Sequence, residues 1–307
     1  MSENTAADRL RTALTDASFE HRVRTVVHRW YTCYETERKN LAHHGELLTP
    51  GFVLHRAPES GLPDVAGRQA YLDGLPHAYP GQANAHHLRG IELTPADDTT
   101  VKAVVTHDFE TRGPSLDGAA VIRYDFELVR DATEWLPRIT TFTEQVVSRH
   151  EAPFTEAYGE NRVRAFLHYW LSLLEQPAAD AEPLRELIAD DLEMTLSDGR
   201  VLRTFEEVSA WYAGARDLVD VSIHHVHDLT VTPGADRTHD LTMEFAWQGI
   251  AKSGRPMTAR TRHAWTLTET DERYLRLSRF HVTALAPFAP VTAEEALAHF
   301  QAARRPA

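Results

Sequence analysis

A histidine in the first half of the chain stands in an otherwise apolar row. His107 alternates with Val101, Ala103, Val105 and Phe109. Because alternate residues of a strand share one face, His107 is expected to point into an apolar interior. There it could act as a general acid or base in a cavity. The alternative is a partly buried, hydrogen-bonded histidine of the core.

Tyr124 and Glu144 are the other candidates for proton transfer. Tyr124 alternates with three apolar residues, which are Ile122, Phe126 and Leu128. Its hydroxyl is therefore expected to meet a partner inside, where it could polarise a carbonyl or protonate an intermediate. Glu144 shares a face with Phe142, so the face that lines the cavity decides whether Glu144 can act. We predict His107, Tyr124 and Glu144 as catalytic residues.

The chain contains an internal repeat, which must position these residues. Residues 22–35 (RVRTVVHRWYTCYE) and 162–175 (RVRAFLHYWLSLLE) are identical at six of fourteen positions, at an offset of 140. Further on the offset becomes 138, and AHHLRGIELTPADD at 85–98 lies over IHHVHDLTVTPGAD at 223–236. Several matches in one order indicate a tandem duplication.

Each copy has helices first and strands after. The first helix of each copy has one apolar stripe, and a shorter helix begins near Arg68 in copy one and near Phe205 in copy two. Thr204 and Glu207 form a capping-box pattern at the start of the latter. Four strand-like runs then follow, at 83–94, 100–111, 118–130 and 135–148, and again at 220–232, 238–250, 257–269 and 273–286. This order predicts an α+β fold, a tandem duplication of a cone-shaped domain with helices packed on a curved antiparallel sheet.

The second copy has Phe245, His263 and Val282 where the first has the three candidates. A duplicated enzyme loses polar groups in this way when one site becomes a support, so we expect the chemistry in the first copy. His263 and His281 stay open as an alternative site.

Two further polar patterns repeat between the copies. Neighbouring strand residues face opposite ways, so only one histidine of each His-His pair can enter a pocket. No acidic third ligand accompanies the histidines, so we expect no metal site. A helical stripe with Arg24, His28 and Glu35 is also kept in copy two; we expect a solvated face or a contact between domains, with closure of the cavity mouth as the alternative.

Composition restricts the partners. The 307 residues carry a net charge of −13 without a basic run, which disfavours nucleic acid. No apolar stretch is long enough for a membrane span, and the start lacks a secretory signal, so we expect a cytoplasmic protein. Cys33, the single cysteine, is expected to be buried. No Walker loop, Rossmann glycine pattern or Gly-x-Ser-x-Gly elbow is present, and we expect no cofactor.

The order of elements resembles the nuclear transport factor 2-like superfamily, in particular its SnoaL-like polyketide-cyclase branch. The likeness is carried by the helix with its Trp, by LLTPGFVLH (47–55), by the His-His opening of the third strand, and by the closing strands PRITTFTEQVV (137–147) and RLSRFHVTAL (276–285). The resemblance implies an apolar pocket in which a carboxylate, histidine or tyrosine works. Glu144 matches an acidic position frequent in SnoaL-like cyclases.

The resemblance implies two classes of function. One is a cofactor-independent lyase, isomerase or cyclase that acts by acid/base chemistry on a hydrophobic, carbonyl-bearing small molecule. The alternative is a non-catalytic protein that binds a hydrophobic ligand or serves as a scaffold. We expect substrate-binding walls from Trp30, Tyr34, His86, Phe109 and Phe126. We expect the second-copy pocket to contain Trp170, His224, Trp247, His263 and His281.

The expected domains are an N-terminal extension (1–18), copy one (19–149), copy two (155–287) and a C-terminal helix (288–307) that begins after Thr292 as N-cap. Tandem copies are expected to pack sheet against sheet as an intramolecular pseudo-dimer. A further homo-oligomer stays open.

Overall fold

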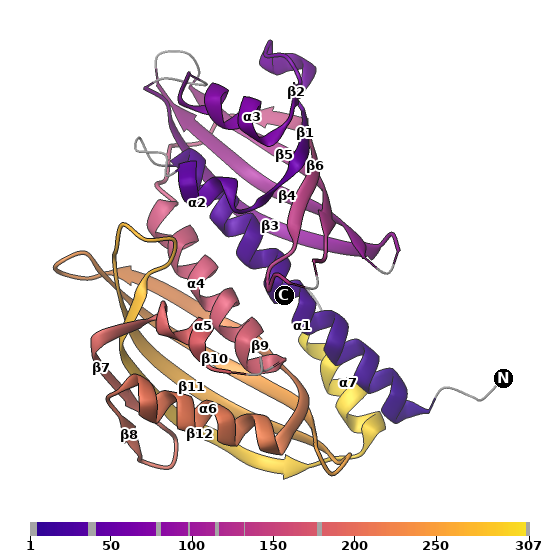
Figure 1. Ribbon diagram of the computed structural model, residues 1–307, viewed down its shortest axis with the longest axis vertical. Helices are drawn as coiled ribbons and strands as arrows, with labels where there is room; N and C mark the ends of the chain where they lie inside the picture. The colour runs from indigo at the N-terminus through magenta and orange to yellow at the C-terminus, as the bar shows by residue number, and fades with distance from the viewer. Residues whose placement is uncertain are drawn as a thin grey trace. The chain divides into compact units, whose positions relative to one another are not determined.

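The computed structural model describes residues 5–35, 41–77, 81–97, 99–113, 117–131, 133–176 and 180–304. These residues form two compact units (Figure 1). We call Arg22–Ala165 the first-repeat unit, and Met1–His21 together with Phe166–Ala307 the second-repeat unit. Each unit contains one six-stranded sheet, and the two sheets have the same topology.

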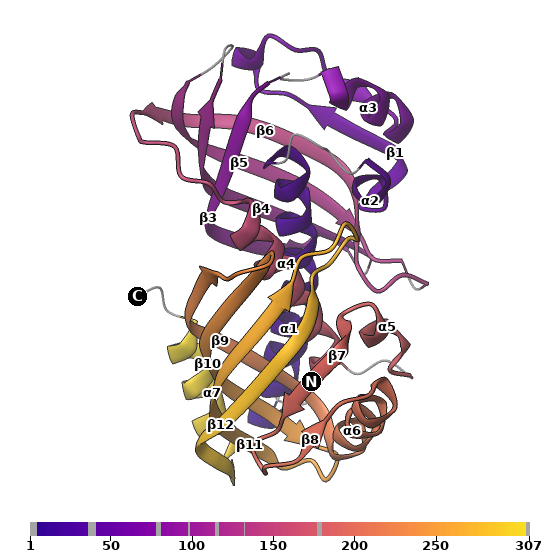
Figure 2. The same ribbon diagram turned by 90° about the vertical axis from the view of Figure 1, so that its left-hand side faces the viewer.

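The sheet of the first-repeat unit has the order β2-β1-β6-β5-β4-β3. Its strands are β1 (Leu48–His55), β2 (Val65–Ala66), β3 (Ala83–Pro95), β4 (Thr100–Arg112), β5 (Gly118–Val129) and β6 (Arg138–His150). The second-repeat sheet has the order β8-β7-β12-β11-β10-β9. Its strands are β7 (Ile188–Thr195), β8 (Val201–Leu202), β9 (Val219–Pro233), β10 (Thr238–Ala251), β11 (Pro256–Thr268) and β12 (Arg276–Pro290). Figure 2 shows the four long strands of each sheet side by side.

The helices lie mostly before the long strands of each repeat. They are α1 (Ala6–Glu35), α2 (Leu41–Gly45), α3 (Arg68–Gly74), α4 (Tyr158–Glu175), α5 (Glu182–Arg185), α6 (Phe205–Leu218) and α7 (Ala293–Ala303), with short 3-10 turns at Pro58–Ser60 and Leu75–His77. Helices α1 and α4 each contribute to both units, because the unit boundaries fall inside them. No helix among the described residues is both long and apolar enough to cross a bilayer.

The duplicated α+β fold expected from the sequence is confirmed. All eight long strands occur within a few residues of the expected ranges. The capping box of Thr204 and Glu207 is present at the start of α6, and Thr292 caps α7. The sheets are mixed and not wholly antiparallel, because β1 runs parallel to β6 and β7 parallel to β12. Each of these short strands leads through a helix into the strand meander, a connection that permits parallel pairing.

The core of the first-repeat unit is built around Trp30 on α1. Its ring packs against Phe126 and Phe142 on the sheet, and against Tyr71 on α3. Strand β5 alternates as expected, with Ile122, Tyr124, Phe126 and Leu128 buried. Cys33, the single cysteine, is buried, as expected. The inner face of the sheet is therefore filled by α1 at one end, and the other end is left for a pocket.

The two terminal segments pack on the second-repeat sheet. Residues 1–18 were expected as an extension, but α1 already begins at Ala6, and Leu10 and Leu14 are buried. They form a cluster with Val221, Ile223, Ile250 and Ala296, and the last of these lies on α7. The first turns of α1 and helix α7 are thus integral parts of the second-repeat unit. Residues 1–4 and 305–307 lie outside the described residues.

Candidate active site

The first-repeat unit contains a cavity of about 300 Å³ between α1 and the inner face of the sheet. Ten of its nineteen lining residues are apolar or aromatic, and nine carry other polar or charged side chains. The residues that line it are Trp30, Tyr34, Leu54, Arg56, Ala57, Glu59, Ser60, Gln82, Asn84, His86, Phe109, Thr111, Ala120, Ile122, Tyr124, Phe142, Glu144, Val146 and Arg149. Apolar and aromatic walls with convergent polar groups are the usual features of a small-molecule site.

His86 on β3 is held against the wall of this cavity by a buried carboxylate. Glu35, the last residue of α1, accepts hydrogen bonds from the backbone N–H of His86 at 2.7 Å and from its Nδ1 at 3.0 Å. The side chain of Glu35 is fully buried. Because Nδ1 donates to the carboxylate, the lone pair of the neutral imidazole lies on Nε2. This nitrogen makes no hydrogen bond among the described residues.

Asn161 on α4 completes the first carboxylate–histidine pair. Its Nδ2 donates to both carboxylate oxygens of Glu35, at 2.8 and 3.1 Å, and to the backbone carbonyl of His86 at 2.9 Å. Its Oδ1 accepts from Nδ1 of His28 at 2.7 Å. Burial, with the nearby Arg164 charge, lowers the pKa of His28 to about 3, so this imidazole is neutral. The network therefore holds Glu35 between the amide of Asn161 and His86.

A second polar chain begins at Tyr34 on the cavity wall. The Tyr34 hydroxyl is hydrogen-bonded to that of Tyr71, and the latter pairs with Nε2 of His44 at 2.9 Å. Burial raises the pKa of both tyrosines. Their hydroxyls consequently stay protonated and can serve as hydrogen-bond donors.

Glu144 lies on β6, directly across from Tyr124 on β5. Both line the cavity, so the face of β6 that carries Phe142 and Glu144 is the inner one. Burial raises the pKa of the Glu144 carboxyl; Arg56 opposes this shift, and Glu59 adds to it. A carboxyl with a raised pKa keeps its proton at higher pH and can serve as an acid.

His107 does not line the cavity. It is completely buried beneath the wall, where its ring contacts Tyr124 at 4.3 Å, His86 at 5.2 Å and Tyr31 at 5.2 Å between centroids. Neither ring nitrogen has a hydrogen-bond partner among the described residues. Burial, together with His86 and His87, lowers its pKa well below the ordinary value. The expected catalytic role is corrected here, because Tyr124 and His86 stand in front of His107.

Of the five residues expected to form the substrate-binding walls, four line the cavity and one does not. Trp30, Tyr34, His86 and Phe109 line the cavity. Phe126 does not, because it is buried in the next layer against Trp30 and Phe142. The sequence pattern gave the inner face of the sheet correctly, but it could not separate the pocket layer from the core layer.

The second-repeat unit has its own, larger cavity of about 730 Å³. Its residues are Trp170, Leu174, Leu196, Ser197, Asp198, Arg200, Leu202, Glu207, Ala210, Trp211, Gly214, Ala215, Leu218, His224, Phe245, Trp247, Ala259, Thr261, His263, Trp265, Phe280, Val282 and Phe288. Trp170, His224, Trp247 and His263 line it, as expected. His281 does not: it is exposed on the opposite face of β12, because its neighbours Phe280 and Val282 point inward.

The carboxylate–histidine pair is repeated in this second cavity. Glu175 accepts from the backbone N–H of His224 at 2.7 Å, and lies 3.3 Å from its Nδ1. His21 stands in the place of Asn161: its Nε2 is 3.3 Å from Glu175, and its Nδ1 is 2.8 Å from Nδ1 of His168. Burial alone would raise the pKa of Glu175, but the charge and hydrogen bond of His21, with those of His224, hold it below its usual value.

Glu35 and Glu175 were not among the expected site residues. Their helical stripe was expected to be solvated or to join domains, yet both carboxylates are completely buried. A signal was present in the sequence: a Glu ends the first helix in both copies, and a His-His pair opens the third strand in both. A buried carboxylate needs donors, and the histidine pair supplies them.

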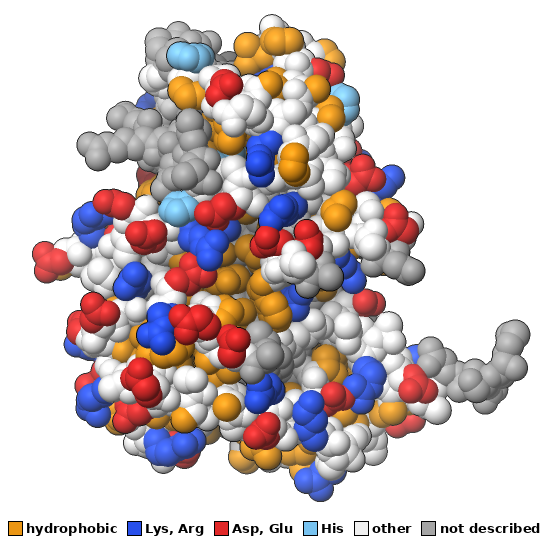
Figure 3. All heavy atoms as spheres, in the orientation of Figure 1, with side chains coloured by type: hydrophobic (Ala, Val, Ile, Leu, Met, Phe, Trp, Pro, Cys, Tyr) orange, Lys and Arg blue, Asp and Glu red, His pale blue; other side chains and the backbone are white. Residues whose placement is uncertain are grey.

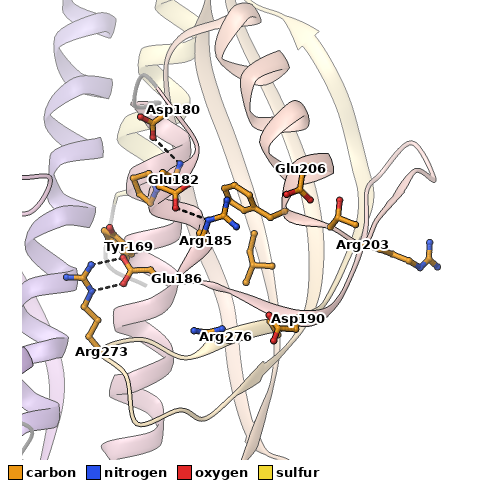
Figure 4. Close-up of a pocket in the computed structure, with 15 residues that line it drawn as sticks. Tyr169, Asp180, Glu182, Arg185, Glu186, Asp190, Arg203, Glu206, Arg273 and Arg276 are labelled. Carbon is orange, nitrogen blue, oxygen red and sulfur yellow. Dashed lines mark hydrogen bonds and ion pairs between the residues drawn. The ribbon is translucent and has the colours of Figure 1, made fainter.

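A third hollow, of about 1030 Å³, lies beside α5 and the start of α6 (Figure 4). Its charged side chains neutralise one another, since Arg273 binds Glu186 at 2.6 and 2.9 Å and Arg185 binds Glu182 at 2.8 Å. Such partly exposed ion pairs are ordinary surface features. In Figure 3 side chains of both charges are likewise mixed over the face shown. Among the described residues no group of three or more His, Cys, Asp or Glu could hold a metal ion.

No protein-family model matches the chain, and no curated protein is similar to it. Similar solved structures include a hexachlorocyclohexane dehydrochlorinase from Novosphingobium barchaimii (12% identity, 43% of this chain and 90% of that one, TM-score 0.38). They also include ActVI-ORFA from Streptomyces coelicolor (13%, 41% and 96%, 0.33) and nuclear transport factor 2 from Cryptosporidium parvum (15%, 39% and 87%, 0.32). Each match covers less than half of the chain, as one repeat would.

Proposed function

We propose that the first-repeat cavity catalyses a cofactor-independent elimination or isomerisation of a compact, hydrophobic molecule that carries a carbonyl group. His86 is the general base in this proposal. The observation that carries it is the buried Glu35, which holds Nδ1 of His86 and leaves the lone pair on Nε2.

The carboxylate supports the base in two ways. It fixes the tautomer and the ring orientation, and it stabilises the imidazolium that forms when Nε2 takes a proton. Asn161 occupies both carboxylate oxygens without adding a positive charge, so His86 is the group that benefits from the charge of Glu35.

The acid side of the reaction belongs to Glu144 and Tyr34. Removal of a proton from the carbon next to a carbonyl places the electron pair on the carbonyl oxygen, as an enolate. A protonated tyrosine hydroxyl at the wall can donate a hydrogen bond to that oxygen. The protonated Glu144 can deliver its proton to another carbon, which gives isomerisation, or to a departing oxygen, which gives elimination.

The walls restrict the substrate. A cavity of about 300 Å³ is at the small end of the range for ligand sites, roughly 300–1,000 Å³. Trp30, Phe109 and Phe142 provide aromatic surface, which favours a one- or two-ring molecule.

The proposal can be tested without knowledge of the natural substrate. The protein is incubated in D₂O with 1-indanone and 2-tetralone, and deuterium uptake next to the carbonyl is followed by mass spectrometry. We expect uptake above the buffer rate, and a loss of about 10²- to 10⁴-fold in His86→Gln. His87→Gln is the matched control, because His87 does not line the cavity; it should exchange at the full rate.

Two outcomes would contradict the proposal. Full exchange in His86→Gln would remove His86 from the mechanism. Ketone binding without exchange would favour the alternative of a non-catalytic binding protein, in which the same walls hold a ligand and transfer no proton.

A further inference from the structure

The two cavities differ in the chemistry of their walls. Four tryptophans line the second-repeat cavity, out of six in the whole chain, and Trp30 alone lines the first. They are Trp170, Trp211, Trp247 and Trp265. Flat aromatic surface of this extent favours a ligand with several rings, which can stack or pack edge to face. The larger volume, about 730 Å³, has room for it.

The second cavity keeps the counterpart of His86, but it has no counterpart of the acid Glu144 or of the Tyr124 hydroxyl. Strand register places Val282 where the first unit has Glu144, and His263 where it has Tyr124. Nδ1 of His263 accepts from Nε1 of Trp265 at 3.2 Å, so the ring proton is on Nε2, which is 2.9 Å from Thr261 Oγ1. Burial lowers the pKa of His263 to about 3. With both nitrogens engaged, this imidazole is part of the wall.

Of the two imidazoles that line the cavity, His224 is the one with a ring nitrogen left open to a ligand. Its backbone and Nδ1 are turned to the ionised Glu175, so the lone pair lies on Nε2. No described residue donates a hydrogen bond to this nitrogen. The complementary ligand group is therefore a hydrogen-bond donor, such as the hydroxyl of a phenol.

Two large apolar side chains of the lining are exposed to solvent, beside the exposed charged residues Asp198, Arg200 and Glu207. Leu218 is 71% exposed and Phe288 is 59% exposed, and both belong to the lining. Large apolar side chains left in water at a pocket mouth indicate a surface that a ligand covers.

We propose that the second-repeat cavity is a separate binding site for a multi-ring aromatic molecule, whose phenolic hydroxyl donates to Nε2 of His224. The site is independent of the reaction proposed for the first cavity. It has His224 and the aromatic walls, but Val282 stands at the position of Glu144.

The probes for the test are 2-naphthol and 2-methoxynaphthalene, which have the same rings but differ in the ability to donate a hydrogen bond. Binding is followed by quenching of tryptophan fluorescence. This signal reports on the second-repeat cavity because four of the six tryptophans line it. We expect the wild type to bind 2-naphthol at least about fivefold more tightly, the ratio that one net hydrogen bond gives. His224→Phe should remove the difference, and Trp247→Ala should weaken both probes.

The His86→Phe variant localises the effect, since it alters only the first cavity and should leave both affinities as in the wild type. Equal affinities in the wild type, or a loss that follows His86→Phe, would overturn the proposal. Should His224→Phe fail to fold, Val282→Trp fills the same cavity without touching the carboxylate network. It should then exclude both probes; full binding to it would also overturn the proposal.

Discussion

Asn161 and His21 occupy equivalent places, 140 residues apart, beside equivalent buried carboxylates. The amide of Asn161 donates to both oxygens of Glu35, whereas the imidazole of His21 lies beside one oxygen of Glu175 and bonds to His168. In the first-repeat unit the carboxylate thus faces one imidazole at close range, His86, and in the second-repeat unit it is shared between two. This single difference separates two otherwise parallel networks.

The role of Glu35 can be tested by Glu35→Gln. The amide keeps the shape of the carboxyl but removes the charge that stabilises the imidazolium of His86. We expect the exchange rate to fall by about 10- to 100-fold, the effect of losing a charge-assisted hydrogen bond. Glu160→Gln, a surface change on α4, is the control and should have the wild-type rate. An unchanged rate in Glu35→Gln would show that His86 needs no carboxylate.

His107→Phe should stabilise the protein. The change removes two buried ring nitrogens that have no partner among the described residues, and Phe245 already stands at this position in the second repeat. We expect a gain of about 1 kcal/mol in the free energy of unfolding, measured with urea. The reverse change, Phe245→His, should cost a similar amount. A destabilised His107→Phe would indicate a buried water that bonds to the imidazole.

Glu144 should limit activity on the alkaline side. Its pKa is raised, so the acid form survives to higher pH than in an ordinary glutamate, and it is lost as the pH rises through that raised value. We expect kcat/KM for isomerisation or elimination, the reactions that use this proton, to fall through this window in the wild type. Glu144→Gln should have a low rate without this alkaline decline. A rate that instead rises through the window would assign Glu144 as a base.

His263 should make the fold sensitive to acid. Its pKa is about 3 in the folded protein against an ordinary value of 6.5, so the unfolded chain binds the proton first. The stability it contributes is complete above pH 6.5 and is lost as the pH falls toward 3, at up to about 1.4 kcal/mol per pH unit. His263→Tyr, which copies Tyr124 of the first repeat, should reduce this slope in urea unfolding at pH 7, 6 and 5. An unchanged slope would show that His263 does not titrate on unfolding.

The sequence predicts the fold well because the repeat shows every long element twice. Period-two rows identify the inner face of each sheet, and Glu144 falls on that face as the position of Phe142 implied. Local patterns also define the caps at Thr204 and Thr292. The strand faces and the helix caps depend on residues that are close together in the sequence, so a local sequence pattern can predict them.

The site is harder to predict. The alternation of residues along a strand shows which side chains point inward, but it does not show which of them reach the cavity and which are buried in the core. His107, Tyr124 and Phe126 all belong to inward rows, but only Tyr124 reaches the cavity. The partnership of Glu35 with Asn161 spans 126 residues, and that of Glu175 with His21 spans 154. A single sequence shows that these residues are repeated, but it does not show that they contact one another in the fold.

The positions of the unit boundaries have a consequence for any attempt to dissect the protein. They fall between His21 and Arg22 in α1, and between Ala165 and Phe166 in α4, so both lie in the middle of a helix. If the chain were cut in the loop after His150, Asn161 and Glu35 would lie on different fragments. The same cut would separate His21 from Glu175. Neither half of the gene would then encode a complete constellation. Each carboxylate network therefore takes one side chain from the sequence of the other copy, Asn161 beside Glu35 and His21 beside Glu175.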